Sequence, residues 1–316
     1  MKKVDLSIII LSYNTKKLLK DCLESVIQNS IPRTEIIIID NGSTDGSKKY
    51  INELTNLRIN GLRIRGIFNE KNLGFAKGNN IGIKQAKGKY IMLLNSDSLI
   101  KEDAIGKLLE FLDRDDPCQT AVSPLLLLPN GEPQVDYYMR FPNLWQIFLY
   151  HHSLLRPFAL KIPFLRNKII GPDSPLKSGR LSPWEVDQLP GAALMVPCAV
   201  WEKVGLLDED YKFLYEDVDW CWRAKKLGYK LMIVPDAKIV HFGGGSWKQK
   251  LKESSFEFYC QYFSSMLLFV KKNYGEAKFK IFRIALVINF LLQFKFKLAR
   301  YFLKNKDIFA QNKLWD

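Results

Sequence analysis

The sequence has few residues of the two types that usually build structural metal sites or disulfide frameworks. Its 316 residues include only three histidines and five cysteines. No C-x-x-C pair is present, and an odd, scattered set of cysteines argues against a disulfide framework or a zinc module. The set instead favours a reducing compartment, so we expect a cytoplasmic protein. The five are Cys22, Cys118, Cys198, Cys221 and Cys260.

Long apolar runs and targeting segments are also missing. No window reaches the roughly 18 uncharged apolar residues that a membrane span needs. The first residues, Met-Lys-Lys, lead at once into a strand-like run, and no small-residue cleavage site follows, so we expect no signal peptide.

Acidic residues are outnumbered, with 33 Asp and Glu against 47 Lys and Arg, for a net charge of +14. This excess is compatible with nucleic acid, an anionic membrane surface or a phosphorylated substrate. The basic residues are spread out and no helix-turn-helix, zinc or RNP pattern accompanies them, so a nucleic-acid partner is not expected. The glycine-containing turn at 74–80 fits neither G-x-G-x-x-G nor a Walker A motif, which argues against dinucleotide and P-loop sites.

Short apolar runs alternate with helical patterns through about residue 128. The alternation predicts an α/β fold with a Rossmann-like, mostly parallel central sheet flanked by helices. Strands are expected at 4–11, 35–39, 62–68, 90–94 and 121–128, and helices after an N-cap at Thr15, after 47, over about 75–86 and over 102–112.

The pattern breaks over residues 129–183, which are rich in proline, aromatic and basic residues and to which we assign no regular structure. Beyond them we expect a strand within 186–196, two further strands at 230–234 and 238–242, and two helical stretches at 256–270 and 281–296. Helices are also expected at 199–204 and 213–228, the second closed by Gly228.

Two aspartates follow buried strands of the predicted sheet. Asp40 closes the second strand, and Asp97 follows the apolar run Tyr90–Leu94. In an open α/β sheet, ligands bind at the carboxyl ends of the strands, and Mg²⁺ or Mn²⁺ commonly shares carboxylate oxygens with substrate phosphates. The alternative is that both aspartates are turn formers at strand ends.

Two further places carry chemistry-bearing side chains. His241 ends an apolar run before three glycines. It could bind Mn²⁺ or serve as a buried structural residue. The other two histidines, His151 and His152, have no carboxylate nearby in the sequence and are interpreted as structural or surface residues. Glu216 and Asp217 lie in the first turn of an expected helix, a position that favours carboxylates. Either a general base or a helix cap fits them, and Asp219 and Arg223 are spaced to pair along the same helix.

Six segments together resemble the family 2 glycosyltransferases of the GT-A fold, particularly the rhamnosyltransferase-like members that build bacterial surface polysaccharides. They occur in the family's order and cover most of residues 4–246. The segments are VDLSIIILSYN, EIIIIDNGSTDGS, NLGFAKGNNIGI, YIMLLNSDS, LPGAALMVPCAVWEKVGLLDEDYKFLYEDVDWCWRAKKLGY and IVHFGGGS.

The resemblance implies roles for matching positions. Asp97 would bind a divalent cation and the diphosphate, with His241 completing the metal site. Asn95 stands where the family's D-x-D has its first aspartate, which removes one charge. Asp217 would be the general base, with Glu216 as the rival. The implied nucleotide-binding residues are Ser12, Asn14, Asp40, Gly74, Asn80, Asn95 and Asp97.

The implied activity is inverting transfer of a sugar from a nucleoside diphosphate, with Mg²⁺ or Mn²⁺ as cofactor. dTDP-rhamnose is the first donor to consider and a UDP-sugar the second, and the acceptor would be a saccharide or a lipid-linked saccharide. A nucleotidyltransferase that makes sugar nucleotides is one alternative, although no glycine-rich, basic N-terminal loop for a triphosphate is present. A non-catalytic saccharide-binding scaffold is another.

We expect a catalytic domain over residues 1–250, with a nucleotide-sugar half (1–128) and an acceptor half (129–250). Residues 251–316 are basic and aromatic, as in amphipathic helices that lie in a membrane interface. Such a tail would hold the protein at the inner face of the membrane, where each basic residue near anionic lipid adds about 1 kcal/mol. The alternative is a helical pair packed on the catalytic domain, with a solvated charged side.

Overall fold

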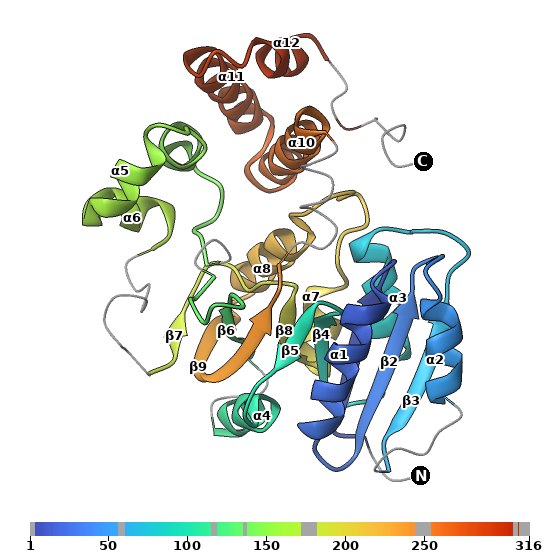
Figure 1. Ribbon diagram of the computed structural model, residues 1–316. Helices are drawn as coiled ribbons and strands as arrows, with labels where there is room; N and C mark the ends of the chain where they lie inside the picture. Colours follow the sequence, from blue (N-terminus) through green and yellow to red (C-terminus); the bar gives the residue numbers. More distant parts are fainter. Residues whose placement is uncertain are drawn as a thin grey trace.

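The computed structural model describes residues 4–55, 61–114, 119–134, 138–171, 182–243, 254–305 and 309. Strands and helices alternate through its first part (Figure 1). The elements there are β1 (Leu6–Ser12), α1 (Lys16–Gln28), β2 (Thr34–Asp40), α2 (Ser47–Thr55), β3 (Arg63–Phe68), α3 (Phe75–Gln85), β4 (Tyr90–Asn95), β5 (Ser98–Ile100), α4 (Ala104–Arg114) and β6 (Thr120–Leu127).

The strands form one sheet, in the order β3-β2-β1-β4-β8-β6-β9-β5. Here β7 is Trp184–Glu185, β8 is Ala193–Pro197 and β9 is Lys230–His241. β1, β2, β3 and β4 pair in parallel, as do β6 and β9, whereas β8 is antiparallel to both β4 and β6. β5 and β7 are also antiparallel to β9. The predicted α/β class with a central sheet flanked by helices is confirmed, and the sheet is parallel over β1 to β4 and mixed beyond them. The strand order reverses at β1, which lies between β2 and β4 in the sheet. In such sheets ligands bind where the strand order reverses.

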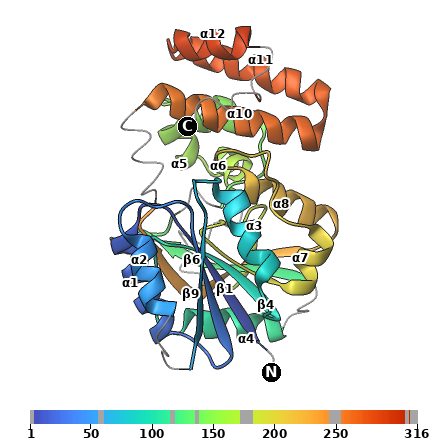
Figure 2. The same ribbon diagram turned by 90° about the vertical axis from the view of Figure 1, so that its right-hand side faces the viewer.

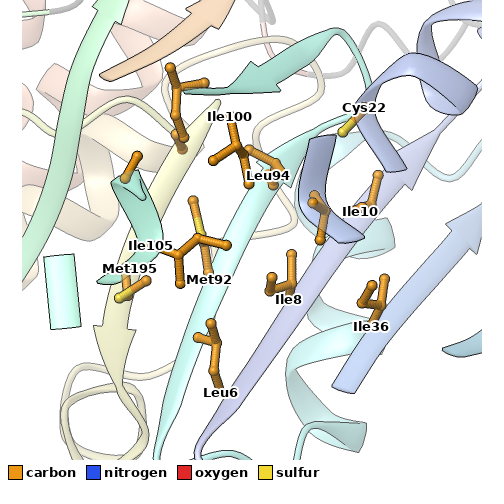
Figure 3. Close-up of a cluster of buried hydrophobic side chains, with 14 of the residues drawn as sticks. Leu6, Ile8, Ile10, Cys22, Ile36, Met92, Leu94, Ile100, Ile105 and Met195 are labelled. Carbon is orange, nitrogen blue, oxygen red and sulfur yellow. The ribbon is translucent and has the colours of Figure 1, made fainter. Parts of the chain in front are cut away.

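The run of four isoleucines in β2 shows why the sheet is buried on both faces. Ile36 and Ile38 belong to one hydrophobic core and Ile37 and Ile39 to the other, because successive side chains of a strand point to opposite faces. Figure 3 shows the first core, where Ile8 and Ile10 of β1 lie between Ile36 and the β4 side chains.

The expected strands at 230–234 and 238–242 are one continuous strand, β9, so that division was wrong. Its pairing with β6 shifts between Pro124 and Leu125, which pair with Val234 and Lys238. The three intervening residues are absorbed in this irregularity, so Pro235 does not end the strand. Of the range 186–196, in which a strand was expected, only the last part forms one, as β8. The two-residue strand β7 lies just before this range.

Two helices lie between β8 and β9. α7 (Cys198–Val204) lies where a helix was expected, whereas α8 (Glu216–Lys226) begins three residues later than predicted. Leu214 and Tyr215 have positive φ angles of 60° and 75° and cannot continue a helix. Gly228, with φ of +87°, donates its N–H to the Lys225 carbonyl and ends the turn as expected.

A second layer of helices, here called the helical cap, stands beyond the carboxyl ends of the strands (Figures 1 and 2). Part of it comes from the segment without a sequence assignment: η2 (Gln146–Tyr150, a π-helix), α5 (Arg156–Lys161) and α6 (Pro163–Ile169). The rest is α10 (Ser255–Tyr274), α11 (Glu276–Leu292) and α12 (Phe296–Lys304), three helices where two were expected.

The cap is attached to α8 and the turn before it. Ser265 of α10 donates to the Phe213 carbonyl, and Asn273 donates to Asp219, 2.8 Å away. Asp219 also pairs with Arg223 at 2.8 Å, as the spacing predicted. Over the described part of the chain, none of these helices has the length and apolar character required to cross a bilayer.

Candidate active site

The polar side chains that follow β1, β2 and β4 lie at one edge of the sheet. Ser12 pairs in register with Asp40, and Leu11 pairs with Asn95. Three loops distant in sequence therefore meet at the same height, as expected for parallel strands that end together.

Asp40 is buried at this edge, with 1% of its surface exposed. Its Oδ1 accepts the N–H groups of Gly42 (3.2 Å) and Ser43 (2.9 Å). Its Oδ2 has no hydrogen-bond partner among the described residues. An unsatisfied buried oxygen costs about 1–3 kcal/mol, so an N–H donor from a ligand would be stabilising here.

The Ser12–Thr15 loop is tied to its neighbours through hydroxyl groups. Thr15 does not cap α1 with its side chain, contrary to expectation. Its hydroxyl lies 2.9 Å from both the Ser12 and the Ser96 hydroxyls. The cap comes instead from Asp45, whose Oδ2 accepts the Lys16 N–H at 2.8 Å.

Asn14 and Asn41 organise the loops around Asp40. Asn14, with a positive φ of 53°, accepts the Thr44 N–H at 2.8 Å. Asn41 was not singled out from the sequence, yet its Oδ1 accepts from Asn69 and the Leu73 N–H, and its Nδ2 donates to Asn72. It thereby holds the loop that leads into α3. Its position directly after a strand, beside Asp40, is the signal that could have marked it.

Two predicted nucleotide residues occupy different settings. Gly74 precedes α3 with φ of +83°, and its carbonyl accepts from Asn41 at 3.3 Å, close to Asp40. A Cβ at Gly74 would meet nothing within 4 Å, so its backbone borders open space. Asn80 is buried, and its amide is engaged by the Leu207 backbone and the Glu209 carboxylate. Asn80 therefore holds the 207–209 loop in place.

Asp97 and His241 lie together where β5 pairs with β9. His241 Nε2 is 3.3 Å from Asp97 Oδ1 and 3.3 Å from Asn95 Nδ2. The backbone joins the same groups, since Ser98 pairs with His241 and the Phe242 N–H donates to the Asp97 carbonyl at 2.9 Å.

Gln134, which the sequence did not indicate, orients the His241 ring. Its Nε2 donates to the His241 carbonyl and its Oε1 lies 2.9 Å from His241 Nδ1. Because the Gln134 oxygen can only accept, the proton must be on Nδ1. In the neutral ring Nε2 then carries the lone pair and faces Asp97, and a second partner of this kind is typical of metal-binding histidines.

This pair of acceptors fits a divalent cation. A carboxylate oxygen and an imidazole lone pair 3.3 Å apart repel one another unless a positive charge lies between or beside them. Within the described ranges no cluster of three His, Cys, Asp or Glu side chains has metal-binding geometry. The chain would therefore supply Asp97 and His241, and the remaining ligands would come from substrate oxygens and water, as is common for Mg²⁺.

Glu216 and Asp217 occupy the first turn of α8, as predicted. Asp217 Oδ2 accepts the Gly191 N–H at 2.9 Å and its Oδ1 accepts the Val218 N–H at 2.8 Å. The next residue, Ala192, accepts the Asn95 N–H at 2.9 Å. Two hydrogen bonds therefore connect Asp217 to Asn95 through consecutive backbone groups, so Asp217 and Asn95 lie in one neighbourhood.

The two acids differ in how their charge is stabilised. Burial, with the neighbouring Asp217 charge, raises the pKa of Glu216 to about 8. Burial also raises the pKa of Asp217, but the backbone N–H groups of Gly191 and Val218 oppose this shift. Asp217 is thus the better ionised of the two near neutral pH, and Glu216 holds its proton.

The fold belongs to the GT-A class. Among solved structures, the chain is similar to GalNAc-T7 with UDP, GalNAc and Mn²⁺, with a TM-score of 0.57 at 17% identity, covering 89% of this chain and 54% of that one. Residues 7–156 match the model of Glycosyl transferase family 2. Over these residues the chain is similar to the family 2 glycosyltransferases.

Curated proteins that the chain resembles in sequence also carry glycosyltransferase names. An uncharacterized glycosyltransferase of Haemophilus influenzae is 27% identical over 165 residues, which are 52% of this chain and 50% of that protein. The putative teichuronic acid biosynthesis glycosyltransferase TuaG of Bacillus subtilis is 31% identical over 137 residues, 43% of this chain and 53% of that protein. The chain spans about half the length of these relatives.

Proposed function

We propose that this chain is an inverting glycosyltransferase that moves a sugar from a nucleoside diphosphate to a hydroxyl group. The observation that carries the proposal is the convergence of Asp217 with the Asp97–His241 pair. Asp217 binds Gly191, whose neighbour Ala192 binds Asn95, and Asn95 contacts His241. The residue proposed as base and the residues proposed for the diphosphate thus lie within one neighbourhood.

Asp217 would act as the general base. Its carboxylate would take the proton of the acceptor hydroxyl while that oxygen bonds to the anomeric carbon, and the bond to the diphosphate breaks with its electron pair leaving on the nucleotide. Inversion follows from this single displacement. Asp217 suits the role better than Glu216 because its two backbone N–H donors favour the ionised form.

Asp97 and His241 would hold a divalent cation, Mg²⁺ or Mn²⁺, whose charge would stabilise the departing diphosphate as a Lewis acid. Gln134 supports this role because, in the neutral ring, it accepts from Nδ1–H and leaves Nε2 as the nitrogen that can bind a metal. The Mn²⁺ named with GalNAc-T7 is consistent with such a cofactor. Asn95 contributes an amide where a second carboxylate would add charge, so substrate oxygens would complete the site.

Asp40 would accept from the base of the donor. Its unpartnered Oδ2 suits the ring N–H that thymine and uracil share. Ser12 pairs with Asp40 in register, Asn14 and Gly74 belong to the adjoining loops, and Asn80 on α3 holds the 207–209 loop. dTDP-rhamnose remains our first proposed donor and a UDP-sugar the second; UDP is the nucleotide named with GalNAc-T7.

The acceptor would be a saccharide or a lipid-linked saccharide of a bacterial surface polysaccharide. The name of TuaG, which refers to teichuronic acid biosynthesis, supports this class. A basic, amphipathic C-terminal region would place the enzyme at the inner face of the membrane.

Product analysis tests the proposed function. The purified chain is incubated with nucleotide sugars, Mn²⁺ and saccharide acceptors, and the released phosphate species are measured. We expect a nucleoside diphosphate and a glycosylated acceptor. Release of pyrophosphate from a nucleoside triphosphate would instead identify a nucleotidyltransferase, and saccharide binding without turnover of any donor would identify a scaffold.

A further inference from the structure

The positive charge of the protein is concentrated in two segments. Residues 138–171 contain five Lys or Arg and no Asp or Glu, and residues 277–305 contain seven Lys or Arg and no Asp or Glu. Together these segments carry twelve of the fourteen net positive charges. The rest of the chain, including the sheet and its edge, is therefore close to neutral.

The two segments lie side by side in the helical cap, although more than 100 residues separate them in the sequence. Gln293, at the end of α11, donates to the His151 carbonyl (3.1 Å) and accepts the Ser153 N–H (3.2 Å). Ile147 of η2 belongs to the same hydrophobic core as α10, α11 and α12. Figures 1 and 2 both show α5 and α6 beside these helices.

Most of the exposed large apolar side chains lie in the same two segments. Among the described residues, fifteen of the nineteen such side chains belong to 138–171 or 277–305. Phe294 is 80% exposed and Leu154 is 73% exposed, and these two lie on either side of the Gln293–Ser153 hydrogen bond. Monomeric proteins rarely leave so large an apolar surface in water without a binding partner.

The exposed residues on α11 follow the period of a helix. Ile281, Ile284, Ile288 and Leu291 recur at spacings of three and four residues and form one outer stripe. The opposite side of α11 already packs into the cap through Phe282, Leu286 and Phe290. Since the inner side fills the core of the cap, the outer stripe has no role in folding that the structure explains.

We propose that α5, α6, α11 and α12 together form one surface that binds an anionic lipid bilayer. The aromatic and aliphatic side chains would enter the boundary between headgroups and acyl chains, and the acid-free basic residues around them would meet lipid phosphates. A nucleic acid fits this surface poorly, because exposed Leu, Ile and Phe side chains gain nothing from a phosphate backbone. The surface therefore includes a segment from the middle of the chain as well as the C-terminal helices.

This surface is coupled to the candidate active site through α10. Two residues of α10 contact the turn that leads directly to Glu216 and Asp217. Ser265 donates to the Phe213 carbonyl, and the Tyr262 hydroxyl lies 3.4 Å from the Tyr215 hydroxyl. Binding to a bilayer would thus present the acceptor half of the site to lipid-linked saccharides, a consequence that rests on the proposed function.

Vesicle co-sedimentation tests the surface without any donor or acceptor. Phosphatidylcholine vesicles with about one third phosphatidylglycerol are compared with pure phosphatidylcholine vesicles, at low and at high salt. We expect binding to the anionic vesicles that weakens at least about tenfold in high salt. Absence of binding to anionic vesicles at low salt would overturn the proposal, whatever the product assay shows.

Matched variants test whether the two segments act as one surface. Phe158→Glu with Phe164→Glu changes the first segment, and Ile284→Glu with Leu292→Glu changes the second. Leu227→Glu, at the end of α8 and 58% exposed, is the control. Either double variant should weaken vesicle binding at least about tenfold, and the control should change it less than about twofold, all with unchanged circular dichroism.

Three outcomes would count against a shared bilayer surface. Loss of binding in the second double variant alone would confine the contact to the C-terminal helices. Equal loss in the Leu227 variant would indicate a nonspecific effect of added negative charge. If the wild-type chain is a dimer that both double variants convert to monomers, with vesicle binding unchanged, the surface joins two copies of the chain instead. Sugar transfer to a water-soluble acceptor should be unchanged in both double variants, so failure of the lipid proposal and failure of the enzymatic one remain distinguishable.

Discussion

The carboxyl edge of the sheet and the helical cap carry charge of very different kinds. At the edge the ionisable groups are few and buried: Asp40, Asp97, Glu216 and His241 are each at most 9% exposed. Backbone N–H groups or neighbouring side chains fix the orientation of most of them. In the cap, twelve Lys and Arg residues stand in two acid-free segments, and the apolar side chains among them are exposed.

This difference suits the edge of the sheet to chemistry and the cap to association with a partner surface. A buried, oriented charge acts strongly on its neighbours because little water screens it, so moving one atom changes protonation or ligand affinity. Exposed charges act weakly one at a time, and their effect grows with their number and falls with salt. Single substitutions should therefore have large effects at the edge and small effects on the cap and its junction.

The largest effect should come from Asp217→Asn. The amide cannot take a proton, so we expect turnover to fall about 10³-fold, within the range attributed to general bases. Nucleotide binding, measured as the rise in melting temperature with added nucleoside diphosphate, should be unchanged. Glu216→Gln is the matched control and should retain most of the turnover. A greater loss of turnover in Glu216→Gln would assign the base to Glu216 instead.

The second effect concerns Gln134 and the metal. Gln134→Leu removes the acceptor for His241 Nδ1–H, and we expect Mn²⁺ affinity in the presence of nucleoside diphosphate to fall about 10- to 100-fold. Gln134→Glu keeps an acceptor and should retain most of the affinity. Nitrogen-15 spectra of the metal-free chain should show His241 protonated at Nδ1 in the wild type and in Gln134→Glu, and a tautomer mixture in Gln134→Leu.

An unchanged His241 tautomer in Gln134→Leu would contradict this role, even if activity fell, because loss of activity alone could arise from a disturbed loop. His241→Asn provides the reference, since it removes the ligand itself and should weaken Mn²⁺ at least as much as Gln134→Leu.

The third effect is on stability and depends on pH. The pKa of Glu216 is raised from 4.5 to about 8 in the folded chain, so the folded state holds a proton that the unfolded state releases. Stability should therefore fall as pH rises from about 4.5 to about 8 and level off above that. Glu216→Gln lacks this proton, so its free energy of unfolding relative to wild type should increase by at least about 1 kcal/mol between pH 5 and pH 8.

Urea unfolding of both proteins across this pH range measures the difference, with Glu202→Gln on α7 as an exposed control. A constant difference between the Glu216→Gln variant and the wild type would mean that Glu216 is ionised in the folded state throughout, and that the edge does not hold a protonated acid.

The sequence predicted the edge better than the cap, for a physical reason. β2 is a short apolar run that ends in Asp40, and the apolar strand β4 is followed two residues later by Asp97, so both aspartates could be placed from local pattern alone. Asp217 lies near this edge through the contacts around Gly191 and Asn95. From the sequence, only the family resemblance suggested that Asp217 would lie there. Gln134 could not be found, because one glutamine in a loop 107 residues from His241 has no local signature.

The cap was missed where its signals were ambiguous. Pro157 and Pro163 fall in the segment to which no regular structure was assigned, but they stand in the first two positions of α5 and α6, where proline is favoured. Pro235 lies between the two strands expected at 230–234 and 238–242, although β9 continues through an irregularity there. At Pro235, the pairing of β9 with β6 determined that the strand goes on.

The smallest effect should occur at the junction between the cap and the segment that precedes α8. Lys272 of α10 pairs with Asp208 at 2.5 Å and with Asp210 at 2.6 Å, and its side chain is 32% exposed. Exposed pairs contribute about 0–1 kcal/mol, so Lys272→Met should lower the free energy of unfolding by about 0.5–1 kcal/mol at low salt. The loss should shrink at high salt, and Lys280→Met, on the exposed side of α11, should change stability less. A loss above about 2 kcal/mol that salt does not reduce would mean that the junction depends on water-shielded charge as the edge does, and the contrast between the two regions would fail.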